Sequence, residues 1–384
     1  MRERIAHFRQ RQRSNYFSPR VVCMKEVKGL GLFSGGLDSI LAAKVLMEQG
    51  IAVTGISFAS LFFSAEQARS AADAIGLPLI TRDISLPQLA LVKNPPHGYG
   101  SNMNPCIDCH ALMLAEAGKI MEAEGYDFLF TGEVLNERPM SQTRNSLIQV
   151  AKLSGYKEYV LRPLSAKLLA ETAAEKRGLV DRTRLLDIQG RSRKRQLALA
   201  AQYDITQFPA PAGGCLLTDP NFAKRLRELF EHNGECSHQE IELLKVGRHF
   251  RIDGIKVIVG RNRQENQIIT ALAAKHDTLL SAEHLPGPVV LVCGGGDRNV
   301  IEKAAGLGVR YSDARYSQPP PALEQIYPPG KQITPCPMSE EVVESMKLTR
   351  EAKSTEQRSG EPRAKRSEQR MMQETGCWRF SPLF

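Results

Sequence analysis

The sequence predicts an α/β protein with a doubly wound parallel sheet, followed by a smaller α+β module. Short apolar strands alternate with helical segments through the first half of the chain, which is the pattern of parallel strands joined by crossover helices. The first strand leads directly into a glycine-rich loop that opens the first helix. From Glu240 onward the spacing of the strands changes, which indicates a second folding unit within the 384 residues.

The predicted elements of the first unit follow one another in regular order. Its strands are expected at Lys28–Phe33, Ile51–Phe58, Leu79–Asp83, Phe128–Thr131 and Val160–Pro163. Its helices are expected at Leu37–Gln49, Ala65–Ile75 and Leu112–Glu124. Gly50 closes the first of these helices, as a C-cap glycine often does.

The second half of the chain has no regular alternation of strands and helices. A basic helix is expected at Ser192–Gln202 and a helix with apolar and basic faces at Phe222–Phe230. The later module is expected to hold strands at Gly247–Phe250, Lys256–Gly260 and Val289–Cys293, with helices at Glu265–Lys275 and Val300–Ala305. Beyond the module, Pro319–Pro321 and Pro328–Gly330 indicate a linker.

The composition is that of an ordinary soluble globular protein, with 42% hydrophobic and 24% charged residues. A formal net charge of +9 fits a polyanionic partner without identifying it. The chain has no apolar run of about eighteen residues, so no membrane span is predicted. The N-terminus lacks the apolar core of a secretory signal, which makes the cytoplasm the expected compartment.

Both ends of the chain are expected to lie outside the folded units. Residues 1–23 are predicted to be a disordered extension. That extension is either sequence upstream of a natural start at Met24 or a basic arm that touches RNA. Arg350–Arg370 is too poor in apolar side chains to bury a core, so it is also expected to be disordered.

The strongest functional signal is Ser34-Gly35-Gly36-Leu37-Asp38-Ser39, placed between a strand and a helix. A loop in this position presents backbone N–H groups and the positive end of a helix dipole to an anion. The glycines let a phosphate approach the backbone, and the serines add hydroxyl donors. Asp38 does not favour phosphate directly, so its expected role is to hold Mg²⁺ or to orient the loop. The alternative is a tight strand–helix turn with an N-capping serine.

Three of the eight cysteines stand in patterns that suggest chemistry. Cys106 and Cys109 form a Cys-x-x-Cys pair followed by His110, and Cys215 lies in a later Gly-Gly-Cys-Leu stretch. Such a pair is compatible with zinc, with an iron–sulfur cluster, with a redox dithiol or with a purely structural role. Zinc normally takes four ligands, whereas a cluster held by three thiolates leaves one iron open to carry a sulfide. The cysteines without another nearby are expected to be structural, namely Cys23, Cys236, Cys293, Cys336 and Cys377.

Basic side chains gather shortly before Cys215. The run Arg191-Ser192-Arg193-Lys194-Arg195-Gln196 is either a solvated helix face or a contact to RNA phosphates. Arg162 and Lys167 are further candidates for contact with phosphate, either of ATP or of tRNA.

The Ser34–Ser39 loop resembles the SGGxDS signature of PP-loop ATPases, also called N-type ATP pyrophosphatases. This resemblance implies a Rossmann-like adenine nucleotide α-hydrolase domain that cleaves ATP between its α and β phosphates, with Mg²⁺ as cofactor. By position, it implies that the pyrophosphate is held by Ser34, Gly35, Gly36, Asp38 and Ser39. It also implies that the nucleotide lies near Ser57, Phe58, Thr131 and Gly132.

The cysteines resemble those of tRNA thiolation enzymes. Asn104-Pro105 ahead of Cys109, together with the later Gly214-Cys215-Leu216, is similar to tRNA 2-thiouridylases, which implies catalytic roles for Cys109 and Cys215. Cys106 adds a third thiol, as in thiolation enzymes that bind a [4Fe–4S] cluster through three cysteines. The resemblance therefore implies a cluster on Cys106, Cys109 and Cys215, and the rival chemistry is a persulfide on the Cys109–Cys215 pair.

The C-terminal module resembles an NFACT-type RNA-binding domain. The resemblance rests on Gly247–Phe250, on Val259-Gly260-Arg261-Asn262 and on the Pro286-Gly287 turn. A small domain that only braces the enzyme is the alternative. The expected organisation is an extension (1–23), a PP-loop ATPase domain (24–190), a basic helical connector with Cys215 (191–239), the NFACT-like module (240–316) and a linker with a disordered tail (317–384).

These features together predict an ATP-dependent tRNA sulfurtransferase that adenylates a uridine and replaces its oxygen with sulfur. The expected partners are tRNA, ATP and a sulfur donor, either sulfide or a sulfur-carrier protein. The target is either the wobble uridine of the anticodon or the uridine that becomes 4-thiouridine. The rival functions are an amide-forming PP-loop ligase and a non-catalytic factor that binds ATP and RNA.

Overall fold

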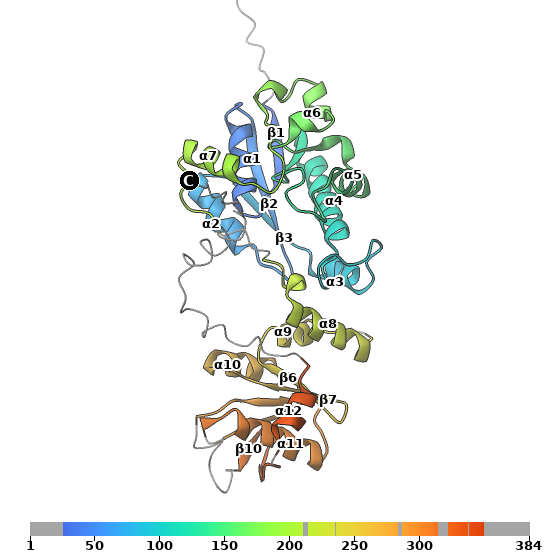
Figure 1. Ribbon diagram of the computed structural model, residues 1–384, viewed down its shortest axis with the longest axis vertical. Helices are drawn as coiled ribbons and strands as arrows, with labels where there is room; N and C mark the ends of the chain where they lie inside the picture. Colours follow the sequence, from blue (N-terminus) through green and yellow to red (C-terminus); the bar gives the residue numbers. More distant parts are fainter. Residues whose placement is uncertain are drawn as a thin grey trace, which may run out of the picture. The chain divides into compact units, whose positions relative to one another are not determined.

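The computed structural model describes residues 26–209, 214–234, 236–282, 286–313, 322–336 and 338–348. The chain divides into two compact units between Ala223 and Lys224, and each is described by itself (Figure 1). The predictions for residues 1–23, for Pro319–Pro321 and for Arg350–Arg370 lie outside the described residues, as do Cys23 and Cys377.

The first unit is built on a five-stranded parallel sheet in the order β3-β2-β1-β4-β5. The strands are β1 (Lys28–Leu32), β2 (Ala52–Ala59), β3 (Leu79–Asp83), β4 (Phe128–Thr131) and β5 (Val160–Leu161). Leu30 of β1 is paired with Thr54 on one side and with Leu129 on the other. The winding of the sheet therefore reverses between β1 and β4, which is where open α/β sheets bind ligands at the carboxyl ends of their strands.

Helices cover both faces of this sheet (Figure 1). Over one face lie α1 (Leu37–Met47), α2 (Glu66–Ile75) and α7 (Lys194–Gln202), and over the other lie α4 (Cys106–Glu124) and α5 (Arg144–Leu153). The remaining helical pieces are α3 (Ser85–Lys93), η1 (Lys157–Tyr159), η2 (Ala166–Leu168), α6 (Ala173–Lys176), η3 (Arg182–Arg184) and η4 (Leu216–Thr218). This two-sided parallel architecture confirms the predicted fold class.

Alternate residues of the strands supply a separate core on each face of the sheet. Phe128 and Phe130 of β4 pack with the apolar side of α1, whereas Leu129 packs with Leu114 and Met121 of α4. Because a strand sends successive side chains to opposite faces, the apolar run of β4 is buried on both of its sides. This burial holds the ends of β1 and β4 at fixed positions.

Helix α4 begins six residues earlier than the apolar periodicity predicts, at Cys106 rather than Leu112. Its first turn is Cys-Ile-Asp-Cys-His, a mainly polar stretch that lacks the apolar spacing of a helix. The Cys-x-x-Cys pair therefore lies on a helix and not in a loop. Helices α3 and α5 were not predicted from the sequence.

The second unit is a six-stranded antiparallel sheet in the order β11-β10-β8-β9-β7-β6. Its strands are β6 (Arg248–Ile252), β7 (Ile255–Val259), β8 (Thr278–Ser281), β9 (Val290–Val292), β10 (Leu323–Tyr327) and β11 (Pro329–Ile333). Its helices are α8 (Pro220–His232, which begins ahead of the division), α9 (His238–Leu243), α10 (Arg263–Leu272), α11 (Arg298–Arg310) and α12 (Glu340–Met346). One core packs α11 against the sheet and a second packs around Ile269 of α10.

Strands β10 and β11 and helix α12 lie in the segment that the sequence predicts to be linker and tail. Pro328 separates the two strands, which pair with one another in antiparallel register. Prolines at a strand start or beside a turn are compatible with a sheet edge. Pro328 and Pro329 interrupt the alternation of apolar and polar residues that marks a strand, so the sequence did not predict β10 and β11.

The Val-Gly-Arg-Asn stretch of the second unit has a structural explanation. Asn266 accepts a hydrogen bond from the backbone N–H of Val289 (3.0 Å) and donates one to the carbonyl of Gly287 (3.2 Å). A Cβ on Gly260 would lie 2.0 Å from Oδ1 of Asn266, so only glycine fits there. Asn266, on the first turn of α10, is thus hydrogen-bonded to the Pro-Gly turn before β9, and Gly260 leaves room for its side chain.

Candidate active site

The glycine-rich loop lies at the carboxyl end of β1 and forms the N-terminal turn of α1. Gly36 occupies the N-cap position and has no side chain to cap the helix. The hydroxyl of Ser39 donates to the carbonyl of Gly36 (2.8 Å), and the N–H of Gly36 donates to the hydroxyl of Ser34 (3.3 Å). These contacts shape a loop at the positive end of a helix dipole, which is an arrangement that favours an anion.

The two glycines of the loop differ in the contacts that an added Cβ would make. Gly35 has φ of +75°, and a Cβ there would lie 2.5 Å from the carbonyl oxygen of Gln67. Gly36 has an ordinary extended backbone, and a Cβ there would meet only the hydroxyl of Ser34 at 3.4 Å. The fold therefore requires glycine at 35, whereas the space beside Gly36 is open toward a ligand.

The Thr131-Gly132 pair at the end of β4 packs closely against this loop. A Cβ on Gly132 would lie 2.5 Å from the backbone nitrogen of Ser39. Thr131 is buried, and its hydroxyl donates to the carboxylate of Glu133 (3.0 Å). Ser57 and Phe58 are buried in β2, where Phe58 belongs to the apolar core under α4.

Asp38 lies in a crowded polar environment at the start of α1. Burial raises the pKa of its carboxyl group, and the nearby Arg193 and Arg138 act in the opposite direction. The carboxyl of Glu137 is also within electrostatic range of Asp38, and its pKa is raised by burial and then by Asp38. Among the residues that the structure describes, Oδ1 of Asp38 is buried without a hydrogen-bond partner. A carboxylate with a free oxygen beside a phosphate loop suits a Mg²⁺ ion bound to phosphate.

Cys109 lies in the first turn of α4 and is 5% exposed. The side-chain amide of Gln88, on α3, donates to its sulfur at 3.1 Å. The segment that carries Cys215 is held nearby by backbone hydrogen bonds. The N–H of Met103 donates to the carbonyl of Leu217 (3.1 Å), and the N–H of Leu216 donates to the carbonyl of Phe62 (3.0 Å).

The three thiols lie within electrostatic range of one another. Burial, together with the nearby thiols of Cys215 and Cys106, raises the pKa of Cys109 to about 12, although the hydrogen bond from Gln88 lowers it. Burial raises the pKa of Cys215 to about 11, and it also raises that of Cys106. Within the described ranges, no group of three or more His, Cys, Asp or Glu side chains is arranged to hold a metal ion. The donor set suits an iron–sulfur cluster, but the coordinating geometry is not formed.

Arg138 connects the two parts of the site. It acts on the carboxyl of Asp38 and also on the thiol of Cys106, whose pKa it lowers against the larger effect of burial. The phosphate loop and the cysteines are therefore within reach of one exposed guanidinium group.

Two histidine–carboxylate pairs flank Cys109. Nδ1 of His97 lies 2.5 Å from Asp108, and Nδ1 of His110 lies 3.2 Å from Glu133. Burial alone would raise the pKa of Glu133, but Arg162 and His110 outweigh it and hold the value at about 2.

The guanidinium of Arg162 reaches Glu133 at 3.0 Å and is 7% exposed, so it braces the interior. The ion pair with Glu133 occupies this guanidinium, and the predicted contact of Arg162 with the phosphate of ATP or tRNA stays a prediction.

Several residues of the site were missed from the sequence alone. Gln88, Glu137 and Arg138 stand in no recognisable motif, and only the folded chain brings them to the loop and the thiols. Arg193 was noticed, but as part of a basic run that predicts a solvated face or an RNA contact. Its position beside Asp38 arises from tertiary packing.

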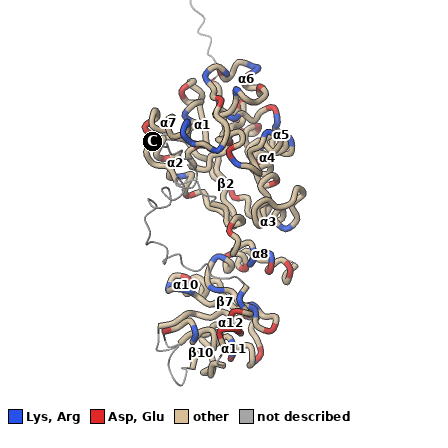
Figure 2. Tube along the Cα trace, viewed as in Figure 1, with Lys and Arg blue, Asp and Glu red and all other residues tan. Residues whose placement is uncertain are grey.

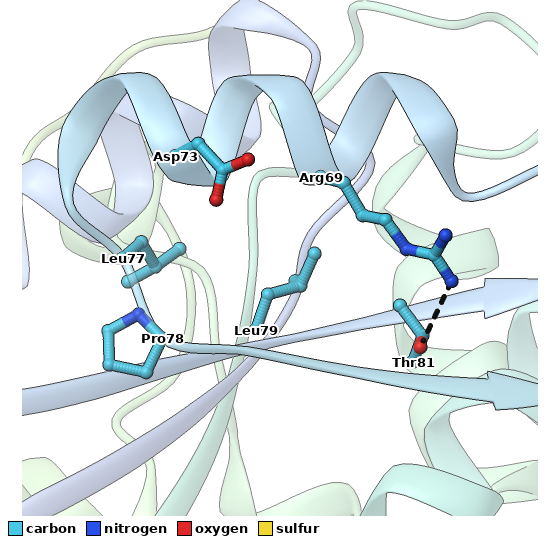
Figure 3. Close-up of a pocket in the computed structure, with 6 residues that line it drawn as sticks. All are labelled: Arg69, Asp73, Leu77, Pro78, Leu79 and Thr81. Carbon is cyan, nitrogen blue, oxygen red and sulfur yellow. Dashed lines mark hydrogen bonds between the residues drawn. The ribbon is translucent and has the colours of Figure 1, made fainter.

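A shallow hollow lies elsewhere on the first unit, between α2 and β3 (Figure 3). Its lining residues are Arg69, Asp73, Leu77, Pro78, Leu79 and Thr81. The guanidinium of Arg69 donates to the hydroxyl of Thr81 at 3.5 Å across this hollow (Figure 3). None of the predicted site residues lines it, so it is separate from the candidate active site.

Among the described helices, none combines the length and the apolar character that crossing a membrane requires.

Comparison with known proteins identifies two matching families. Residues 25–170 match the family "Thiamine biosynthesis protein (ThiI)", and residues 247–342 match the family "NFACT protein RNA binding domain". A curated relative, the tRNA-specific 2-thiouridylase MnmA 1 of Syntrophus aciditrophicus (strain SB), is 26% identical over 215 residues. That match covers 51% of this chain and 54% of the relative, so the chain spans about half the length of the curated relative.

Solved structures with partial similarity include a 4-thiouridine synthetase–RNA complex with bound ATP, at 20% identity and a TM-score of 0.30. That match covers 53% of this chain and 50% of the other. A predicted tRNA methyltransferase subunit from Methanocaldococcus jannaschii is 18% identical, with a TM-score of 0.28 and coverage of 40% and 73%. The family and sequence matches confirm the resemblance to PP-loop tRNA thiolation enzymes and to an NFACT-type domain.

Proposed function

We propose that this protein is an ATP-dependent tRNA sulfurtransferase, which adenylates a uridine and replaces its oxygen with sulfur. One observation carries the proposal: the Thr131–Glu133 segment packs against Ser39 of the phosphate loop through Gly132, and its Glu133 meets His110, the neighbour of Cys109, at 3.2 Å. A site that joins an anion-binding loop to three neighbouring thiols suits a reaction in which ATP activates a carbon that sulfur then attacks. The matches to the ThiI family and to a 2-thiouridylase support the same reaction class.

The first step would use the phosphate loop. The uridine oxygen attacks the α phosphate of ATP, the bond to the β phosphate breaks, and pyrophosphate leaves. The backbone N–H groups at the start of α1 and the hydroxyls of Ser34 and Ser39 would hold the phosphates. Asp38 would hold the Mg²⁺ that accompanies them, with Glu137 close by. The main contribution of the protein here is positioning and charge neutralisation.

The second step would take place at the cysteines. A sulfur nucleophile at the oxidation level of sulfide attacks the activated carbon, the carbon–oxygen bond breaks, and AMP leaves with the former uridine oxygen. A [4Fe–4S] cluster on Cys106, Cys109 and Cys215 would supply an iron on which such a sulfide is bound. The burial of Cys109 and its hydrogen bond from Gln88 would shield the sulfur site from water.

The second unit would bind the tRNA. Its match to an RNA-binding family covers residues 247–342, which include every strand of its sheet. The net charge of +9 over the chain favours a polyanion. A uridine must leave the base stack before its carbon can reach a buried thiol group.

The test is sulfur incorporation into tRNA with the full chain under anaerobic conditions. ATP, a sulfide source and tRNA lacking the modification should give a thiolated uridine by nucleoside mass spectrometry, with one pyrophosphate released per sulfur. Cys109→Ala and Cys215→Ala should abolish the product. Cys336→Ala is the matched control, because Cys336 is exposed in the second unit and belongs to no proposed site.

Two outcomes would reject the proposal. Pyrophosphate release with a carboxylate and ammonia, and not with tRNA, would favour an amide-forming ligase. ATP and tRNA binding without pyrophosphate release would favour a non-catalytic factor. Iron and sulfide analysis of the wild type and Cys106→Ala tests the cluster separately, because a persulfide mechanism, supplied with a persulfide donor and a thiol reductant in place of sulfide, would give thiolated tRNA without iron.

A further inference from the structure

Buried polar atoms gather without partners beside the phosphate loop. Among the described residues, Nε of Arg193 and Oδ1 of Asp38 are buried without a hydrogen-bond partner, and the buried amide of Gln196 lies beside the Asp38 carboxyl, whose pKa it lowers. Gln196 is 0% exposed. A buried polar group without a partner destabilises the folded protein, so such atoms beside a loop call for an explanation.

The start of α7 is held firmly in this position. The helix packs against α1 in the same apolar core, to which it contributes Ala200. Just before α7, Gln189 forms a parallel bridge with Leu135, and the N–H of Gly190 donates to the carbonyl of Leu135 (2.8 Å). This bridge joins the segment that leads to Arg193 to the one that leads to Arg138.

Buried Ser165 strengthens the same junction. Its hydroxyl accepts a hydrogen bond from the N–H of Leu135 (3.0 Å) and donates one to the carbonyl of Ile188 (2.7 Å). The two arginine-bearing segments are therefore fixed to one another and to the turn after β5.

The phosphate loop needs positive charge that its own sequence does not provide. Ser34–Ser39 contains no Lys or Arg and carries the carboxylate of Asp38, with Glu137 nearby. A polyphosphate bound there brings several more negative charges. Arg193 and Arg138 are positive charges that act on the Asp38 carboxyl. A guanidinium fork also matches the geometry of two phosphate oxygens.

The basic run before Cys215 divides between two environments. Arg195 pairs with Asp187 at 2.6 Å, and both side chains are more than half exposed. Arg193 is half-buried, its Nε has no hydrogen-bond partner among the described residues, and its charge acts on the Asp38 carboxyl. Figure 2 shows Lys and Arg positions gathered at the start of α7, close to α1. One arginine of the run thus belongs to the surface and another to the phosphate site.

We propose that Arg193 and Arg138 bind the β and γ phosphates of ATP, and then the pyrophosphate, while Gln196 holds Asp38 in position for Mg²⁺. This inference rests on the proposed function, because it assigns the residues that neutralise the leaving group. Gln196 is a positioning residue, since it acts through Asp38. Its buried amide supplies both a donor and an acceptor beside that carboxylate.

The experiment measures equilibrium binding of MgATP, magnesium pyrophosphate and AMP to the full chain. Arg193→Gln and Arg138→Gln should each weaken binding of MgATP and pyrophosphate by about tenfold or more, as loss of a charge-assisted hydrogen bond does. Binding of AMP should change by less than about twofold, because AMP lacks the β and γ phosphates. Arg195→Gln is the matched control from the same run and should bind all three like the wild type.

The outcomes separate this inference from the proposed function. A wild type that does not bind MgATP would reject the proposed function itself. A wild type that binds MgATP, with arginine variants that bind it equally well, would overturn only the arginine assignment. Equal losses for AMP and ATP would also overturn it, since the arginines would then act on the adenosine end or on folding. Arg138 is exposed, so its variant keeps the test valid if Arg193→Gln does not fold.

Gln196 is tested through Mg²⁺. Gln196→Leu should bind AMP normally, yet it should need about tenfold more Mg²⁺ to reach half-maximal pyrophosphate release, as expected when support for a metal ligand is lost. A merely structural role would lower activity at every Mg²⁺ concentration without moving the midpoint. An unchanged midpoint would overturn the positioning role.

Discussion

Gln88 donates its side-chain amide to the sulfur of Cys109 across 3.1 Å, and both residues are buried. The other amide atom of Gln88, Oε1, has no partner among the described residues. We expect Gln88→Leu to leave the unfolding free energy of the iron-free protein unchanged or to raise it by about 1 kcal/mol, because it removes that unpaired oxygen. The same variant should slow sulfur transfer by about tenfold or more, since it removes a donor to the sulfur.

Urea denaturation and tRNA thiolation measured on the same preparations check this prediction. If Gln88→Leu loses stability and activity together, the amide is a structural support and the link to sulfur chemistry is wrong.

The two glycines of the phosphate loop should respond differently to alanine. Gly36→Ala should fold like the wild type, because its Cβ would meet only Ser34 at an ordinary contact distance of 3.4 Å. It should nevertheless weaken MgATP binding, because the added methyl occupies the space that a phosphate would take. Gly35→Ala should lower the unfolding free energy by more than about 1 kcal/mol, since its positive φ and the Gln67 carbonyl oppose a side chain.

Thermal unfolding and calorimetric titration with MgATP distinguish the two variants. Normal ATP affinity in Gly36→Ala would mean that no phosphate lies against that part of the backbone.

The pKa of Glu133, near 2 in the folded protein, makes stability depend on pH. The ordinary pKa is 4.5, and the folded value lies below it because Arg162 and His110 outweigh the effect of burial. A lowered carboxyl pKa contributes stability that is fully present above the unfolded pKa and is lost as pH falls through the folded one. The contribution of Glu133 should therefore fade between pH 4.5 and pH 2.

Glu133→Gln should remove this dependence and lower the unfolding free energy by about 3–5 kcal/mol at neutral pH, because it leaves buried Arg162 without its counter-charge. Glu158→Gln is the control, since that carboxylate is 58% exposed and its ion pairs with lysine are 3.8 and 3.9 Å long. Its effect should stay below about 1 kcal/mol. Urea midpoints of the wild type and both variants are measured between pH 2 and pH 5. If the midpoint of Glu133→Gln changed with pH as steeply as that of the wild type, the assignment to Glu133 would be refuted.

Asn266 should govern the stability of the second unit. Asn266→Ala removes the hydrogen bonds to Val289 and Gly287 and leaves the largely buried N–H of Val289 unpaired, at a cost of about 1–3 kcal/mol. Asn299→Ala is the control, because its bond to Asp253 is exposed and its loss should change stability by less than about 0.5 kcal/mol. Hydrogen exchange of the β9 amides would report the local opening directly, and equal protection in both variants would contradict this role.

The parallel sheet and the phosphate loop were predictable because their signals are local. A strand, a loop and a helix in Lys28–Met47 are specified by residues within one short stretch. The position of α7 was not predictable in the same way. The basic run gives no sign that Arg193, rather than its neighbours, acts on Asp38. That arrangement follows from the packing of Ala200 of α7 into the core that contains α1.

The cysteine site lies between these extremes. The pattern of Cys106 and Cys109 was visible, but the polar first turn of α4 concealed that the pair lies on a helix. The proximity of Cys215 was suggested by a resemblance alone, and the fold secures it through hydrogen bonds from Met103 and Leu216. Gln88 had no signal at all, because a glutamine in an apolar helix has the same pattern whether or not it meets a thiol.

The tether of Cys215 also sets an order of assembly during synthesis on the ribosome. Leu216 and Leu217 hydrogen-bond to Phe62 and Met103, which are synthesised much earlier. Cys215, the third thiol, therefore reaches its place only after the residues of the parallel sheet have been made. The Ser34–Ser39 loop, Arg138 and Arg193 all precede it in the chain. A nascent protein would thus acquire its means of holding ATP before its means of handling sulfur.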